Sequence, residues 1–141
     1  MHNQDAALSR AMLSLYGLTV GDQFGELFFV DQDKFEQQVN ELKIPAGAWQ
    51  FTDDTEMALS VVSNLAEFGE IKQAELMASF AQHHVMSRGY GPSMRRVLTE
   101  IQSGQDWQQV IAASFAGQGS FGNGSAMRIG PLGAFFTRWS P

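Results

Sequence analysis

The chain has 141 residues, of which 44% are hydrophobic and 17% are charged, and its formal net charge is −6. This length corresponds to one domain, and eleven Phe and three Trp provide enough apolar surface to exclude intrinsic disorder. Cysteine is absent, which excludes disulfides and a cysteine nucleophile, and the acidic balance argues against nucleic acid as a partner.

Neither a targeting segment nor a membrane span is visible in the sequence. The first ten residues, MHNQDAALSR, lack a basic region followed by an apolar run, and no apolar stretch approaches about 18 residues. We therefore expect a cytoplasmic protein with no membrane partner. The sequence does not indicate an oligomeric state.

Apolar residues recur at helical spacing along most of the chain, and no segment alternates as a strand would. The pattern predicts a helix over 6–20 that ends at Gly21, a short helix around 33–42, and a loop over 44–47. Further helices are expected over 53–69, 72–86, 93–104 and 106–116, with Gly69 ending the first of these and Asp106 as N-cap of the last. A final helical stretch begins near Ser125 and should be interrupted or kinked at Gly130-Pro131. We predict a single all-α domain over residues 1–141, a compact multi-helix bundle.

The distribution of charge changes near the end of the chain. No acid follows Asp106, whereas Arg128 and Arg138 are present, and the sequence stops directly after an apolar stretch. Because domains normally carry acids throughout, this pattern favours a truncated chain; a compact domain with a neutral last helix is the alternative. A truncated fold would leave apolar faces open on helix 55–68 and on the last helix, and such faces are expected to cause association.

Two adjacent acids open a helix in the segment Thr52-Asp53-Asp54-Thr55-Glu56. Adjacent carboxylates repel each other, so a cation or the positive end of the helix dipole must favour them. Oxygen ligands from Thr and Asp suit a hard ion such as Mg²⁺, Mn²⁺ or Ca²⁺. The competing interpretation is a cap, with Asp53 as N-cap and Glu56 reaching back to it. Spacing slightly favours the cap, although a cap requires a single acid.

A second motif, Gly117-Gln-Gly-Ser-Phe-Gly122, has the spacing G-x-G-x-x-G. It does not fit a dinucleotide-binding fold, because a helix precedes it and no acid lies about 20 residues downstream to hold a ribose. A glycine-rich loop that enters a helix still offers N–H groups to an anionic or ribosyl group, and Phe121 can stack on a ring. A flexible loop with Phe121 anchored in the core is an equal alternative.

Two shorter motifs carry less information by themselves. Gly21-Asp22-Gln-Phe-Gly25 follows the first predicted helix, and Asp22 is either an acid that supports a site or a cap for the next segment. Arg88-Gly-Tyr-Gly-Pro92 is a loop in which the Arg88 guanidinium is able to meet a phosphate and Pro92 begins a helix. In isolation, each is better explained as a turn.

Taken together and in this order, the four motifs resemble those of the ADP-ribosylglycohydrolase family. The matching segments are 21–25 (GDQFG), 52–55 (TDDT), 88–91 (RGYG) and 119–128 (GSFGNGSAMR), of which the last is the most specific. The resemblance extends from about residue 8 to residue 136 and implies an all-α fold. It also implies a hydrolase that cleaves the glycosidic bond between ADP-ribose and a modified side chain or a small molecule.

The resemblance further implies a site with two divalent ions, usually Mg²⁺ or Mn²⁺. Thr52, Asp53 and Asp54 would be metal ligands, and the two aspartates are the candidate catalytic residues. ADP-ribose or an ADP-ribosylated substrate would lie against the loop formed by Gly119, Ser120, Phe121, Gly122 and Asn123, with Tyr90 and Gly91 beside the same cleft. Phe121 would lie near the ring systems of the ligand.

Two departures from the family pattern bear on the chemistry. Family members are considerably longer, and their C-terminal half carries a second acidic motif, Asp-x-Asp-Thr/Ser, which completes the metal pair and is absent here. Many members also carry a Glu where this chain has Phe29, and Glu26 is the nearby acid that could substitute. We therefore expect a hydrolase by descent with an incomplete second metal site, whose 141 residues turn over poorly or not at all. The alternatives are a non-catalytic ADP-ribose-binding module and a helical interaction domain.

Overall fold

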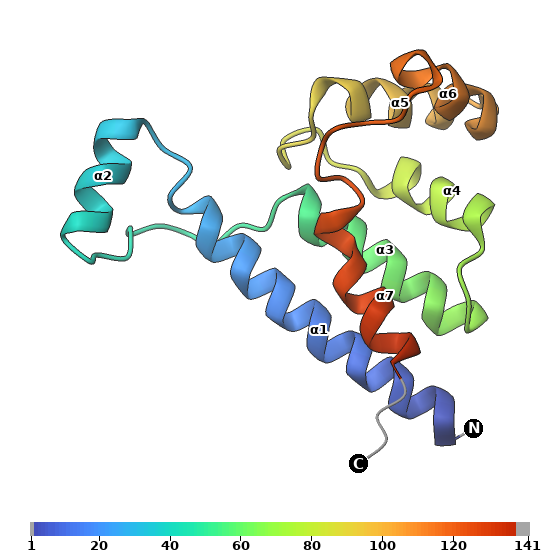
Figure 1. Cartoon of the computed structure of the whole chain (residues 1–141), viewed down its shortest axis with the longest axis horizontal. Helices are drawn as coiled ribbons and strands as arrows, with labels where there is room; N and C mark the ends of the chain where they lie inside the picture. The colour runs from blue at the N-terminus through green and yellow to red at the C-terminus, as the bar shows by residue number, and fades with distance from the viewer. Residues whose placement is uncertain (1, 138–141) are drawn as a thin grey trace.

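The computed structural model describes residues 2–137, which form seven α-helices and two short 3₁₀ helices and contain no strand (Figure 1). In chain order these are α1 (His2–Glu26), α2 (Gln32–Asn40), α3 (Asp53–Phe68), α4 (Gln73–His83), α5 (Pro92–Gln102), α6 (Trp107–Ala113), η1 (Ser114–Gly117), η2 (Ala126–Arg128) and α7 (Ile129–Phe136). The all-α prediction is confirmed. Arg138, noted above for its charge, lies outside the described residues. None of the described helices is long and apolar enough to cross a membrane.

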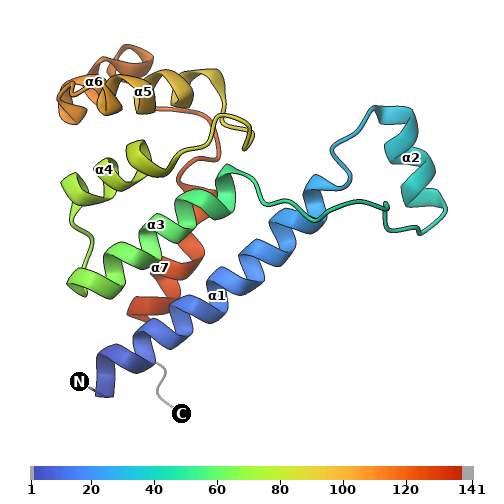
Figure 2. The same ribbon diagram turned by 180° about the vertical axis from the view of Figure 1, so that it is seen from behind.

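Helix α3 is the centre of the bundle and carries much of the core. Its positions Met57, Ala58, Val61 and Leu65 are buried, as their helical spacing predicts. Figure 2 shows α1 on one side of α3 and α4 on the other, and α7 packs against both α1 and α3. Gly69 ends the helix in the left-handed conformation, and its N–H donates to the Leu65 carbonyl, so this predicted boundary is confirmed.

Two predicted boundaries and one predicted break in a helix are wrong. Helix α1 continues past Gly21 to Glu26 despite the roughly 1 kcal/mol cost of a glycine inside a helix, and the hydrogen bonds that Asp22 accepts from Thr52 and Thr55 tie this end to the start of α3. Helix α4 ends at His83, before the predicted Met86. Pro131 does not kink a helix, because it lies in the first turn of α7, where the missing N–H would have no partner within the helix.

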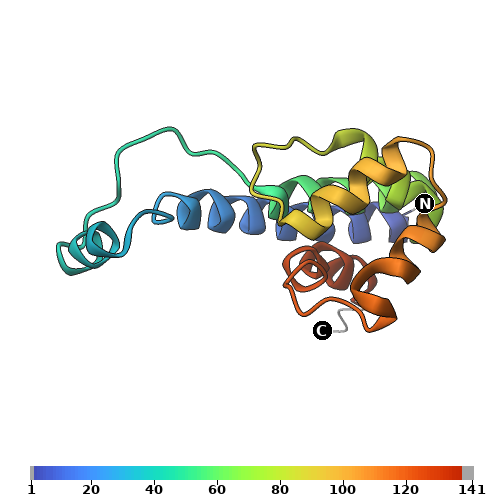
Figure 3. The same ribbon diagram turned by 90° about the horizontal axis from the view of Figure 1, so that it is seen from above.

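The segment that contains α2 forms an arm, defined here as residues 27–51, which projects from the C-terminal end of α1 (Figure 3). The predicted helix around 33–42 is confirmed, but no residue of α2 is buried. Phe24 holds the base of the arm, with its ring centroid 5.2 Å from that of Phe28 and 6.0 Å from that of Trp49. The Gln23 side chain also donates a hydrogen bond to the Trp49 carbonyl. The arm is thus attached at its base, and α2 contributes no residue to the core.

An open apolar face lies on α1. Leu13, Tyr16, Val20 and Phe24 follow one another at helical spacing and are exposed, Leu13 to 69%. On α7, Ile129 and Phe136 are exposed, as expected. On α3, Leu59 and Phe68 are exposed, but most of the apolar residues of this helix are buried. We call the row of Leu13, Tyr16, Val20 and Phe24 the α1 outer face.

We expect the purified 141-residue chain to self-associate through the α1 outer face, because exposed apolar patches of this kind drive association. Light scattering coupled to gel filtration should give a mass that rises with concentration. The double variant Leu13→Gln, Val20→Gln should shift the mass toward the monomer, whereas Leu42→Gln in the arm should not. A wild-type chain that stays monomeric at high concentration would contradict this expectation.

Candidate functional site

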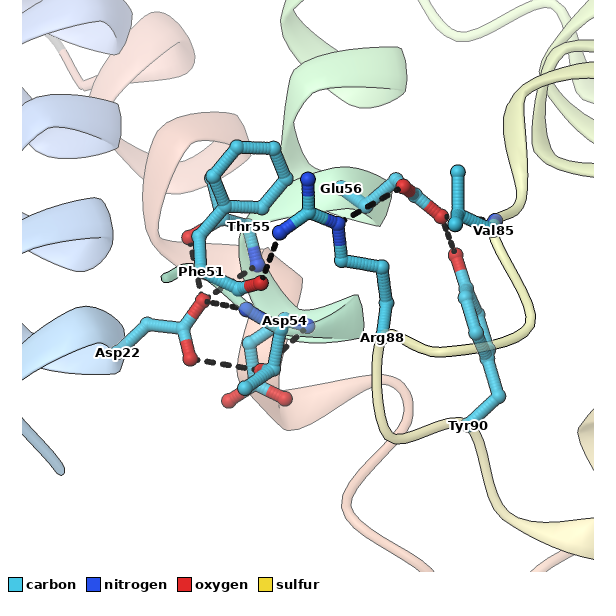
Figure 4. A network of polar contacts seen from close by, with 9 residues as sticks. Asp22, Phe51, Asp54, Thr55, Glu56, Val85, Arg88 and Tyr90 are labelled. Atoms are coloured by element: carbon cyan, nitrogen blue, oxygen red, sulfur yellow. Dashed lines mark hydrogen bonds and ion pairs between the residues drawn. The ribbon is translucent and has the colours of Figure 1, made fainter. Parts of the chain in front are cut away.

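The N-terminus of α3 is fixed by a carboxylate from α1. Asp22 accepts hydrogen bonds from the backbone N–H and hydroxyl of Thr52, at 2.9 and 2.6 Å, and from those of Thr55, at 3.3 and 2.6 Å (Figure 4). These contacts place a negative charge at the positive end of the helix dipole and satisfy donors that have no partner within the helix. Asp22 therefore does not cap the next segment of the chain, because the N-cap of α2 is Asp31; it supports the start of α3 instead. The extension of α1 past Gly21 brings Asp22 to this position.

The capping interpretation of Asp53 and Glu56 is wrong. Thr52 is the N-cap of α3, and its hydroxyl accepts a hydrogen bond from the Asp54 N–H at 3.3 Å. Glu56 does not reach back to the cap but accepts from other parts of the chain. Neither the Asp53 nor the Asp54 carboxylate has a side-chain hydrogen bond with another described residue. The two adjacent acids at the start of α3 therefore have no capping role.

The surroundings of the Asp53 and Asp54 side chains disfavour the ionised form of both carboxyl groups. Burial raises the pKa of the Asp53 carboxyl above its usual range, and the charges of Asp54, Asp22 and Glu56 raise it further. Burial and then the charge of Asp22 likewise raise the pKa of Asp54. Negative charge that the neighbouring residues do not balance is a favourable environment for a cation.

Two grooves meet at Asp53. The acidic groove has a volume of about 810 Å³ and is lined by Leu18, Gly21, Asp22, Gly25, Glu26, Phe29, Thr52, Asp53, Asp54, Gly89, Gly91 and Asn123. The glycine-loop groove has a volume of about 480 Å³ and is lined mainly by residues 119–124 and by Pro92, Met94, Val97, Ile111, Phe115 and Met127. Asp53, Gly91 and Asn123 line both grooves. A ligand that occupies both grooves would therefore pass these three residues.

All five predicted binding residues of the 119–123 loop line the glycine-loop groove. Phe121 is 98% exposed, so the alternative in which its ring is anchored in the core is wrong. The sequence pattern does not single out Phe115, which lines the same groove. Its φ of 53° lies in the left-handed region, and strained backbone of this kind is often found at ligand-binding positions.

Gly91 lies between the grooves, in keeping with the prediction, but Tyr90 does not face either groove. The Tyr90 side chain is 2% exposed, and its hydroxyl donates to the Glu56 carboxylate at 2.9 Å. Burial, together with this hydrogen bond, raises the pKa of the Tyr90 hydroxyl well above its usual range. The expectation that Tyr90 contacts the substrate directly is therefore corrected: Tyr90 is buried beneath the site, where it binds Glu56.

The oxygen ligands in the acidic groove are of the type that a hard divalent cation prefers, but they are too few to complete a site. Asp53 and Asp54 offer carboxylate oxygens and Thr52 a hydroxyl oxygen, all of which such a cation prefers. Within residues 2–137, however, no group of three or more His, Cys, Asp or Glu is arranged to hold a metal ion. Glu26 lines the same groove from the end of α1, beside the exposed Phe29.

Comparisons with known proteins identify the family of this chain and some of its relatives. The model of the family described as ADP-ribosylglycohydrolase matches residues 3–141. The chain belongs to the ADP-ribosylglycohydrolase family. It is 34% identical over 140 residues to ADP-ribosylhydrolase ARH3 of Danio rerio, which covers 92% of this chain and 38% of that protein. It is 32% identical over 132 residues to ADP-ribosyl-[dinitrogen reductase] glycohydrolase of Rhodospirillum rubrum, which covers 86% of this chain and 43% of that protein.

This member of the ADP-ribosylglycohydrolase family thus spans 38% to 43% of the length of these two relatives. The fold brings together the segments on which the resemblance rests, although they lie far apart in the sequence. Residues of segments 21–25, 52–55, 88–91 and 119–128 all line the acidic groove, and Asp53 and Asn123 connect it to the glycine-loop groove.

Proposed function

We propose that this chain contributes the ligand-binding part of a hydrolase that cleaves the glycosidic bond of ADP-ribosylated proteins or small molecules and releases ADP-ribose. The observation that carries the proposal is the junction at Asp53 of two unlike grooves, one acidic and one apolar and rich in glycine. ADP-ribose is divided in the same way, with an aromatic base and a diphosphate at one end and a hydroxyl-rich ribose at the other. The names of the relatives, which are longer proteins, describe activity on ADP-ribosyl groups.

The glycine-loop groove suits the base and the diphosphate. Met94, Val97 and Ile111 supply apolar lining, and the exposed ring of Phe121 is free to stack on a base. Backbone N–H groups of residues 119–124 offer donors to phosphate oxygens with little side-chain bulk. Of the four acids that line the acidic groove, only Asp53 also lines this groove, so a diphosphate would meet fewer repelling carboxylates here.

The acidic groove suits the terminal ribose and the bond to be cleaved. Thr52, Asp53 and Asp54 are the residues that would hold Mg²⁺ or Mn²⁺. A bound divalent ion of this kind supplies positive charge that fixes ribose hydroxyls and lowers the pKa of a water molecule. Because two carboxylates cannot neutralise a pair of such ions, we expect weak metal binding, an incomplete second metal site, and little or no release of ADP-ribose by this chain.

Glu26 is the candidate for proton transfer. Cleavage at ribose passes through an oxocarbenium-like transition state, and a carboxylate that takes or gives a proton assists it. Asp22 is unsuited to this role because four hydrogen bonds engage its oxygens. Glu26 lines the acidic groove at the end of α1 and would serve in place of the acid expected at Phe29.

A non-catalytic ADP-ribose-binding module is the second candidate, because Thr52 and Asp54 do not line the glycine-loop groove and a base could bind there without metal. Calorimetric titration of the chain with ADP-ribose, with and without Mg²⁺, separates the candidates. We expect binding that Mg²⁺ strengthens. Binding of equal strength without Mg²⁺ would favour the module, and no binding in either condition would contradict the proposal and leave a helical interaction domain.

A further inference from the structure

Glu56 is a buried carboxylate that the proposed ligand contacts do not use. It lies within one turn of Asp53 on α3 and is 8% exposed. Its Oε1 atom accepts hydrogen bonds from the Val85 N–H at 2.8 Å and from the Tyr90 hydroxyl at 2.9 Å. Its Oε2 atom lies 3.8 Å from Nε of Arg88. One side chain therefore contacts both ends and the middle of residues 85–90, which we call the 85–90 loop (Figure 4).

The 85–90 loop in turn contacts Asp53. The Asp53 N–H donates to the Arg88 carbonyl at 2.7 Å. Gly89 has a φ of 91°, and a Cβ at this position would stand 3.3 Å from Oδ1 of Asp53, so the backbone passes very close to the carboxylate. Gly91, directly after the loop, lines both grooves. The position of the loop therefore determines the positions of Asp53 and Gly91, two of the three residues that line both grooves.

Arg88 fastens the same loop to the segment before α3. Its guanidinium lies 3.8 Å from the centroid of the Phe51 ring, and its Nη1 donates to the Phe51 carbonyl at 2.7 Å. Burial of a carboxylate is costly unless its oxygens are satisfied, and both hydrogen bonds to Oε1 of Glu56 come from the 85–90 loop. Displacement of the loop would leave Glu56 buried without these donors, so the loop and α3 are held together as one unit.

We propose that Glu56 is a positioning residue that holds the 85–90 loop through Val85 and Tyr90 and thereby fixes Asp53 and Gly91 in the geometry that ADP-ribose requires. The inference rests on the proposed function for the identity of the ligand. The role requires two hydrogen bonds accepted by one oxygen atom, which a glutamine side chain also provides. Glutamine should therefore replace Glu56 in this role, whereas alanine should not.

The test compares the full chain with Glu56→Ala, Glu56→Gln and Tyr90→Phe, and with Glu100→Ala as a control. Glu100 lies on α5 and pairs with Arg96, away from the loop. Backbone amide NMR spectra report the environments of Asp53, Gly89 and Gly91 without ligand, and calorimetry reports the affinity for ADP-ribose.

We expect Glu56→Ala to shift the amide resonances of Asp53, Gly89 and Gly91 and to weaken ADP-ribose binding about tenfold, as is typical when a supporting contact is lost. Tyr90→Phe should shift the Asp53 amide less than Glu56→Ala does, and in the same direction. Glu56→Gln and Glu100→Ala should bind as the wild-type chain does. The rescue by glutamine separates a positioning role from one that depends on charge.

The inference would be overturned if the amide resonances of Asp53, Gly89 and Gly91 did not shift in Glu56→Ala. It would also be overturned if Glu56→Gln weakened ADP-ribose binding as strongly as Glu56→Ala. If Glu56→Ala does not fold, the other two variants decide: Tyr90→Phe must shift the Asp53 amide resonance, and Glu56→Gln must leave the Gly89 and Gly91 resonances in place. A wild-type chain that fails to bind ADP-ribose would contradict the proposed function but not this inference, because the amide shifts still test it.

Discussion

Asp22→Ala is expected to lower the free energy of unfolding by about 3 kcal/mol. The Asp22 carboxylate accepts four hydrogen bonds from Thr52 and Thr55, and it joins α1 to the start of α3. Thr55 is buried, so its donors would lose their partner without gaining water, at a cost of roughly 1–3 kcal/mol for each buried group. The favourable interaction with the helix dipole would be lost as well. Unfolding in denaturant, followed by circular dichroism, measures the change.

Two further variants make this result specific. Asp22→Asn keeps one acceptor oxygen and should recover part of the lost stability. Asp31→Ala removes the N-cap of α2, which accepts a hydrogen bond from the Lys34 N–H. Because α2 has no buried residue, this change should affect global unfolding little. Wild-type stability in Asp22→Ala would show that these four hydrogen bonds do not hold α1 against α3.

Asp53→Asn is expected to weaken Mg²⁺ binding about tenfold or more, without any loss of stability. Removal of an N-cap would cost about 1 kcal/mol, but the Asp53 carboxylate caps nothing. Its charge is instead opposed by burial and by the neighbouring Asp54, so its removal relieves repulsion in the metal-free chain. Weaker metal binding together with undiminished stability distinguishes a ligand from a cap.

Calorimetry with Mg²⁺ and thermal unfolding on the same samples provide both quantities. Asp33→Asn is the matched control for net charge, because Asp33 lies in the first turn of α2, on the arm and away from both grooves. It should leave the affinity for Mg²⁺ unchanged. An Asp53→Asn chain that loses stability but keeps its affinity for Mg²⁺ would contradict the assignment of Asp53 as a ligand.

Local sequence patterns predict much of the fold. The apolar spacing of α3 and the glycine at position 69 define that helix well, because burial of one face and a left-handed C-cap are local requirements. Asp106 is the N-cap of α6 as predicted, with its side chain accepting from the Gln109 N–H. The composition of residues 119–123 likewise indicates an exposed loop, and these residues line a groove.

The support of the site is harder to predict, because it depends on contacts between segments far apart in the sequence. Asp22 meets Thr52 across 30 positions, and this contact exists because α1 continues through Gly21, against the local signal. Glu56 meets Tyr90 across 34 positions. The sequence indicates both residues as part of a motif, but their geometry follows from how α1, α3 and the 85–90 loop pack together.

The arrangement of ligand and cation around Asp53 can be observed directly in crystals of this chain soaked with Mn²⁺ and ADP-ribose. We predict anomalous density for Mn²⁺ at the carboxylates of Asp53 and Asp54, with the terminal ribose in the acidic groove and the base beside Phe121. Empty grooves, with both carboxylates hydrogen-bonded to backbone amides instead, would contradict this prediction.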